Sequence, residues 1–229
     1  MQLKITLAVI AGGAVTCLAG PVVPVQQYRA IDAEGFVHNA VVSGIDQDGD
    51  SMQANDFGLF DRSVSVDVSV GQMYSGASSS QQSFISPWTI AAVGSTSVTL
   101  SMVFAESASQ ATAESAMEMT FDVLEPTPIT FQAQVSELND LLGVDFYNAD
   151  ASFYLSTGWG VSEEIDYTGT LFPGRYTVYA FSQTYLEGYP QSPPQTAVSS
   201  WGLRVQVVPG SGTLAALALG GLVSCRRRR

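Results

Sequence analysis

A strict alternation of apolar and polar residues recurs along this chain. Residues 63–70 read Ser-Val-Ser-Val-Asp-Val-Ser-Val, which places four valines on one side of an extended strand and polar side chains on the other. A half-buried β-strand produces this two-residue period, and an amphipathic helix does not. Five further segments read in the same way: 96–105, 117–124, 129–135, 175–183 and 202–208.

Turn signals separate the alternating segments. Glu-Pro-Thr-Pro at 125–128 and Phe-Pro-Gly at 172–174 each precede a strand pattern. Only residues 138–142 suggest a turn of helix. Nine or ten short strands divided in this way predict an all-β chain, folded as an antiparallel, jelly-roll-like β-sandwich. Three further stretches read as polar or proline-rich loops: 46–51, 75–83 and 189–195.

Both ends of the chain carry predicted targeting signals, which we call the address segments. Lys4, an apolar stretch and small residues before Ala19 predict a signal peptide over residues 1–19, cleaved after Ala19. Residues 212–225 are uncharged and are followed by four arginines. Because about 20 apolar residues span a membrane, this segment predicts a short transmembrane helix with its arginines on the cytoplasmic side. Residues 20–207 then form one ectodomain, and residues 208–229 form the C-terminal signal.

A motif that contains Gly210 and Ser211 precedes an apolar segment with the pair Gly220-Gly221, and the arginine tail follows. In these features the C-terminal segment resembles the PEP-CTERM sorting signal of Gram-negative bacteria, whose usual form has Glu and Pro where Gly210 and Ser211 stand. The order of segments over residues 63–229 is also similar to the β-rich domain of many such proteins. The motif residues are Val208, Pro209, Gly210, Ser211, Gly212 and Thr213, and the tail residues are Arg226, Arg227, Arg228 and Arg229.

This resemblance implies an export route and a partner. An exosortase in the inner membrane would cut near the motif and release the protein to the cell surface or the extracellular matrix, so contact with the membrane is transient. A simple single-span anchor is the alternative interpretation of the same segment.

The charge of the ectodomain excludes one class of partner. The whole chain has a formal net charge of −12, but Lys4 and the tail arginines lie in the two address segments. Four basic residues then face 21 acidic ones, a net charge of −17 for the ectodomain. Such a surface repels nucleic acid. Both cysteines, Cys17 and Cys225, also lie in the address segments, so the ectodomain has no disulfide framework or thiol chemistry.

The sequence contains no combination of residues that indicates a catalytic site. His38 is the single histidine, which excludes a multi-histidine metal centre and leaves a Ser-His-Asp triad without support. Glu163 and Glu164 are adjacent, and neighbours on a strand point to opposite faces, so they do not form the facing acid pair of a glycosidase. We therefore expect a protein that is not an enzyme, with a polysaccharide hydrolase as the last alternative.

One acidic segment suggests a cation. Asp46, Asp48 and Asp50 alternate in a predicted loop, and carboxylates that converge there could bind Ca²⁺. The EF-hand pattern fails, since Ser51 and Phe57 occupy the positions that need Gly and Glu. A solvated acidic turn is the preferred interpretation, and no cofactor is expected.

Aromatic residues in loops suggest contact with sugar. Trp159 lies between two glycines, and Tyr185 and Tyr189 lie in or near a Gly/Pro-rich stretch, so these rings could stack on glycans or fill the ends of the core. The function predicted first is a secreted, non-enzymatic component of the extracellular matrix, associated with exopolysaccharide. A carbohydrate-binding module is the alternative.

Overall fold

The regular structure is β-strand throughout the residues that the structure describes. The computed structural model describes residues 22–101, 103–104, 106–136, 140–158 and 160–208. Their strands are β1 (Val22–Asn39), β2 (Gly44–Ala54), β3 (Phe60–Val70), β4 (Met73–Ser86), β5 (Thr89–Leu100), β6 (Ala108–Val123), β7 (Thr127–Ser136), β8 (Asp140–Asn148), β9 (Tyr154–Ser156), β10 (Glu163–Leu171), β11 (Gly174–Gly188) and β12 (Gln195–Val207).

These strands form two six-stranded antiparallel sheets, as an antiparallel β-sandwich requires. Sheet A has the order β2-β1-β6-β11-β8-β9 and sheet B the order β10-β7-β12-β5-β4-β3. Within them, β5 pairs with β12, β6 with β11, β7 with β10 and β8 with β9. This nested pairing is that of a long hairpin rolled into two sheets, the arrangement of a jelly roll. The hairpins β1–β2 and β3–β4 add two strands to each sheet at one edge.

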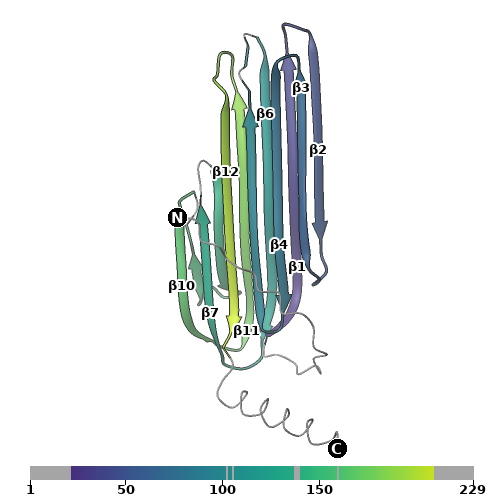
Figure 1. Cartoon of the computed structure of the whole chain (residues 1–229). Helices are drawn as coiled ribbons and strands as arrows, with labels where there is room; N and C mark the ends of the chain where they lie inside the picture. Colours follow the sequence, from purple (N-terminus) through teal and green to yellow (C-terminus); the bar gives the residue numbers. More distant parts are fainter. Residues whose placement is uncertain (1–21, 102, 105, 137–139, 159, 209–229) are drawn as a thin grey trace, which may run out of the picture.

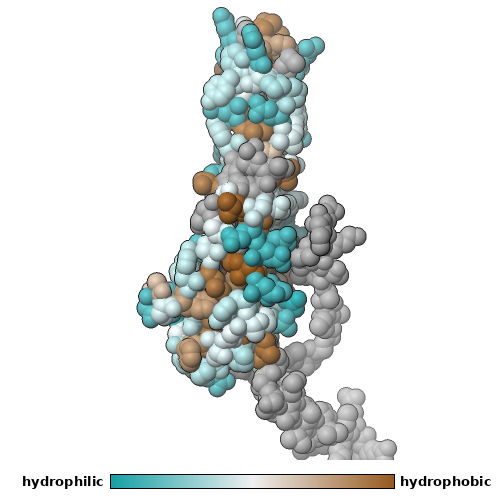
Figure 2. Space-filling model, turned by 90° about the vertical axis from the view of Figure 1, so that its left-hand side faces the viewer, coloured by the Kyte–Doolittle hydropathy of each residue, from teal (hydrophilic) through white to brown (hydrophobic). Residues whose placement is uncertain are grey.

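The sandwich is long and narrow. The strands of both sheets run lengthwise, and the β1–β2 hairpin forms part of the upper end (Figure 1). Figure 2 shows the same outline from the side, with an upper part narrower than the lower. The lower part holds the larger core cluster, which includes Phe121, Phe131 and Phe146, whereas the upper core consists mainly of valine and alanine. Small side chains fill less space between the sheets, in keeping with the narrower upper part in Figure 2.

Two predicted loops are strands, and this corrects the sequence interpretation. Residues 75–83 lie inside β4 and residues 46–51 inside β2. In β4 the inward residues include buried serines, and the hydroxyls of Ser75 and Ser79 donate to the backbone oxygens of Gln110 and Glu114 on β6. A hydroxyl with a partner can face the core at little cost, so a serine-rich strand needs no apolar alternation.

Two smaller expectations also change. Leu141 and Leu142, predicted as part of a helical turn, lie in β8, where Leu142 is fully buried and Leu141 is exposed. The strand predicted over 96–105 begins earlier, at Thr89, and ends at Leu100. The turns at 125–128 and 172–174 do separate strands, as predicted, although the first is shorter because β7 already begins at Thr127.

A buried arginine bonds to the loop that crosses from sheet A to sheet B at one edge of the sandwich. Arg29 on β1 is fully buried, and its guanidinium lies 5.1 Å from the centre of the Phe60 ring. It donates to the backbone oxygens of Asp56 and Gly58, at 2.6 and 2.7 Å, and to Ser83 Oγ on β4 at 2.9 Å. Arg29 thereby fixes the loop that carries the chain from β2 in sheet A to β3 in sheet B.

The address segments lie almost wholly outside the described residues. This applies to the predicted signal peptide with Ala19, to the motif beyond Val208, to the predicted transmembrane helix and to the arginine tail. In the part of the chain that is described, no helix is long and apolar enough to cross a membrane.

Candidate functional site

The outer face of sheet A is rich in tyrosine. Paired residues of neighbouring strands project to the same side of a sheet, so the register shows which side chains share this face. We call the outward side chains of β1, β6, β11, β8 and β9 the outer tyrosine face. It holds five of the nine tyrosines of the chain: Tyr28, Tyr147, Tyr154, Tyr179 and Tyr185.

Tyr179 lies in a row that crosses the middle of this face. The register aligns Tyr28 on β1, Glu118 on β6, Tyr179 on β11 and Asp145 on β8. The Tyr179 ring stacks on that of Phe181, with centroids 6.3 Å apart and planes 10° apart. Burial, followed by the neighbouring carboxylates, raises the pKa of Tyr179, so its hydroxyl is neutral at physiological pH. The row therefore places aromatic rings beside carboxylates.

Two more tyrosines continue the face toward its β9 edge. Tyr147 on β8 pairs with Tyr154 on β9, which is 58% exposed. The Tyr154 hydroxyl donates to Asp145 Oδ1 at 3.2 Å. The carboxylate of Asp145 thus lies within reach of rings from two rows, and it holds the Tyr154 side chain against the sheet.

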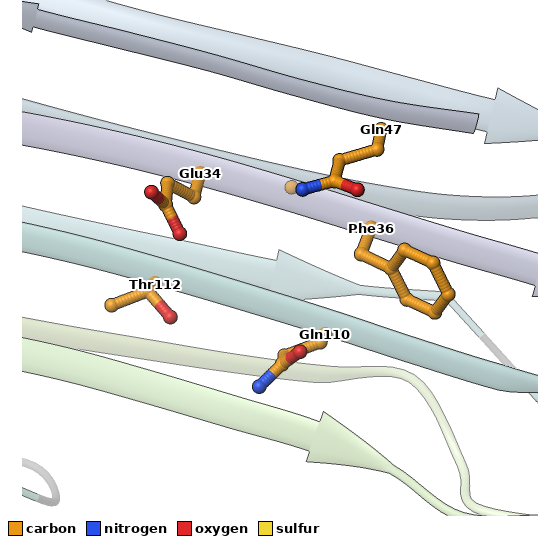
Figure 3. Close-up of a pocket in the computed structure, with 6 residues that line it drawn as sticks. Glu34, Phe36, Gln47, Gln110 and Thr112 are labelled. Atoms are coloured by element: carbon orange, nitrogen blue, oxygen red, sulfur yellow. The ribbon is translucent and has the colours of Figure 1, made fainter.

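An open hollow lies at the upper end of the same face. It has a volume of about 230 Å³ and is lined by residues of β1, β2 and β6. In Figure 3, Glu34 and Phe36 project from β1 beside Gln110 and Thr112 from β6, while Gln47 reaches in from β2. The lining combines one aromatic ring, one carboxylate, two amides and one hydroxyl. Such a mixture can contact both the apolar and the hydroxyl groups of a sugar ring.

A hydrogen-bonded cluster joins the hollow to the tyrosines. Gln110 Nε2, at the hollow, donates to the Tyr185 hydroxyl at 2.9 Å. The hydroxyls of Tyr185 and Tyr189 both donate to Glu187 Oε2, at 3.2 and 2.9 Å. These tyrosines are 38% and 62% exposed. Their rings are held in place by these bonds, which lowers the entropy that a ligand must remove on binding.

Seven carboxylates make this face strongly acidic. Burial, followed by repulsion from Glu34, raises the pKa of Asp32, and burial followed by repulsion from Asp32 raises the pKa of Glu114. Arg175 is the one arginine or lysine among the described outward side chains of the face, and it is paired with Asp122 at 2.8 Å. The seven carboxylates belong to Asp32, Glu34, Glu114, Glu118, Asp122, Asp145 and Glu187.

The structure brings together two of the three aromatic residues predicted for glycan contact. Tyr185 and Tyr189 meet at Glu187, whereas Trp159 lies outside the described residues. Trp201 is a core residue, 2% exposed, and its indole nitrogen donates to the backbone oxygen of Ser115 at 3.2 Å. Of the sorting motif, only Val208 is described. It follows β12 directly, and its amide donates to Pro128 O at 2.9 Å.

The acidic segment proposed for Ca²⁺ has a different geometry from the predicted loop. Asp46, Asp48 and Asp50 lie on the edge strand β2, where alternate residues are about 7 Å apart and parallel, so they do not converge as loop ligands do. Asp46 Oδ2 instead accepts a bond from the amide of Ser69 at 3.1 Å. Among the described residues, no group of three or more acidic, histidine or cysteine side chains is placed to hold a metal ion.

The sequence interpretation missed most of the outer tyrosine face. Tyr28, Tyr147 and Tyr154 come from strands that are far apart in the chain, and only the cross-strand register places them together. One signal was present: residues 175–183 alternate, and both sides of that alternation carry aromatic residues. The inward side includes Tyr176, which is buried, so the rings of Tyr179 and Phe181 were left on the outer side.

Comparisons with known proteins assign no family. No protein-family model matches the chain, and no curated protein matches it. Among solved structures, the chain is similar to one in the cryo-EM structure of Broad Bean Stain Virus, with 6% identity, a TM-score of 0.21 and coverage of 87% of this chain and 92% of that one. It is also similar to the GH31 alpha-xylosidase of Xanthomonas citri, with 12% identity, a TM-score of 0.15 and coverage of 69% and 30%. A third similarity is to tailspike protein 4 of bacteriophage CBA120, with 12% identity, a TM-score of 0.10 and coverage of 58% and 19%. TM-scores this low carry no argument about function.

Proposed function

We propose that this protein is an exported, non-enzymatic β-sandwich that binds polysaccharide at the cell surface or in the extracellular matrix. The observation that carries the proposal is the outer tyrosine face. Aromatic rings on the outer face of a sheet can pack against the apolar faces of sugar rings, and adjacent carboxylates and amides accept or donate bonds to sugar hydroxyls. The face extends about 20 Å from Tyr179 to Tyr185 along β11, long enough for several units of an extended polymer.

The rings of Tyr179 and Tyr185 are the proposed main contacts. Replacing either with alanine is expected to weaken binding to exopolysaccharide or to a glycan on an array about tenfold, the loss typical of a residue that dominates an interface. Affinity electrophoresis in gels that contain the polysaccharide measures the change. The matched control is Tyr74→Ala, because Tyr74 lies on the outer face of sheet B.

The result that contradicts this proposal is equally specific. If the unmodified protein binds no polysaccharide of the producing organism, the proposal is wrong. If Tyr74→Ala weakens binding as much as Tyr179→Ala does, the binding surface is not the outer tyrosine face. Circular dichroism of each variant separates lost binding from lost folding.

Sorting by an exosortase is the second part of the proposal. It rests on the resemblance of residues 208–229 to a sorting signal, and the end of β12 at Val207 supports a boundary there, because the motif begins where the sandwich ends. We expect the mature surface protein to lack residues 1–19 and the arginine tail. Intact-mass spectrometry of protein recovered from the cell surface tests this, and a persistent Arg226–Arg229 tail would show that the segment is an anchor.

A further inference from the structure

The charge of the outer tyrosine face identifies the class of polysaccharide more narrowly. Seven carboxylates lie on this face with Arg175 as the one arginine or lysine described there, and Arg175 is already paired with Asp122. A polymer that carries uronic acids or sulfate would be repelled, and a neutral polymer would gain no attraction from these charges. A polymer with ammonium groups would be attracted at every carboxylate.

The positions of the carboxylates relative to the rings also favour a polymer with ammonium groups. Glu34 and Phe36 both line the upper hollow. In the row that crosses the middle of the face, Glu118 lies between Tyr28 and Tyr179. An ammonium group is attracted by a carboxylate and also by the face of an aromatic ring, whereas a hydroxyl gains little from the ring. Carboxylates that lie next to aromatic rings can therefore bind a sugar that has both an apolar face and a positive charge.

The acidity of the whole chain does not account for this arrangement. On the outer face of sheet B, the four central strands β7, β12, β5 and β4 carry no carboxylate among their outward residues, and the acids lie on the edge strands β3 and β10. The middle of that face is instead a ladder of hydroxyls across neighbouring strands: Ser136, Ser200, Ser95, Ser80 and Ser63. Central carboxylates beside aromatic rings are thus a property of sheet A.

We infer that the outer tyrosine face binds a linear polysaccharide of amino sugars with free amines, held by Glu34 at the hollow and by Glu114 and Glu118 along β6. This inference rests on the proposed function, since it names the ligand class of the same face. Aromatic rings contact the sugar planes, and the carboxylates pair with the ammonium groups.

Three hexasaccharides of one backbone geometry test the inference on the full chain. They are β-1,4-linked glucosamine, its fully N-acetylated counterpart and the glucose hexamer, measured by isothermal titration calorimetry at pH 6 in low salt. We expect the glucosamine hexamer to bind at least about tenfold more tightly than the other two, because several exposed charge pairs together supply a difference of that size. The preference is expected to shrink as salt is added.

A double variant assigns the preference to named residues. Glu34→Gln with Glu114→Gln should reduce the preference to about threefold or less, mainly by weakening the binding of the glucosamine hexamer. The matched control is Glu164→Gln with Asp166→Asn, which removes the same charge from edge strand β10 on the other sheet. If the control removes the preference and the first variant does not, the inference is overturned. Equal affinity of the unmodified protein for all three hexamers also overturns it but leaves the proposed function in place, whereas failure to bind any glycan overturns both.

Discussion

Replacing Arg29 with alanine is expected to lower the free energy of unfolding by about 3–5 kcal/mol. The substitution leaves a cavity where a fully buried side chain stood, and it removes the donor from two backbone oxygens, those of Asp56 and Gly58, and from the hydroxyl of Ser83. Urea unfolding, followed by tryptophan fluorescence to which the buried Trp201 contributes, measures the loss. Since whole domains are stable by about 5–15 kcal/mol, this one change removes a large share of the total.

The backbone bonds, and not the ion pair, account for this effect. The side chain of Asp56 is 81% exposed, so its carboxylate is solvated and the pair with Arg29 contributes little. Burial lowers the pKa of Arg29, and the nearby Asp56 partly opposes that shift. Asp56→Ala is therefore expected to cost about 1 kcal/mol or less, because the backbone oxygen of residue 56 remains as an acceptor.

An exposed arginine provides the matched control. Arg62 on β3 is exposed, and its guanidinium donates only to the neighbouring Asp61 oxygen among the bonds described. Arg62→Ala should change the free energy of unfolding by about 0.5 kcal/mol or less. If Arg29→Ala costs no more than Arg62→Ala, the loop between β2 and β3 is held by other contacts, and the account given for Arg29 is wrong.

The sequence predicts those strands that bury apolar side chains on one side. The valines at 64, 66 and 68 are all buried in β3, where the alternation placed them. The strands that it misses follow other rules. In β4, buried serines bond to backbone oxygens of the opposite sheet, so a polar sequence faces the core. In β2, both faces are exposed at the sheet edge, so no apolar side is needed, and charges there also discourage pairing with other chains.

The candidate site was predictable only where its residues are close in the chain. Tyr185 and Tyr189 both lie within two residues of Glu187, and the sequence placed them in one cluster. Tyr28 and Tyr179 share a row because β1 and β11 both pair with β6. Alternation shows which side of a strand faces outward but not which strands become neighbours, since many pairings bury the same apolar residues.

Replacing Phe146 with alanine is expected to lower the free energy of unfolding by about 3–5 kcal/mol. Phe146 lies on β8, is fully buried and is the centre of the aromatic cluster in the lower core. Its ring centroid lies 5.0 Å from that of Phe131 and 4.9 Å from that of Phe153, and 6.0 Å from those of Phe121 and Tyr176. Removal of the ring leaves these four without their common neighbour, and a close-packed core refills such a cavity only in part.

Two variants distinguish this packing effect from a general loss of aromatic surface. Phe84→Ala removes a ring that is 45% exposed on the outer face of sheet B, and it should cost about 0.5 kcal/mol. Phe146→Leu keeps most of the apolar volume and should cost about 1–1.5 kcal/mol. Because Asp145 and Tyr147 project from the other side of β8, the leucine variant should still bind polysaccharide as the unmodified protein does. If Phe146→Ala unfolds at the same urea concentration as Phe84→Ala, the aromatic cluster does not anchor β8, and the position of the outer tyrosine face must depend on the β11 side of the sheet alone.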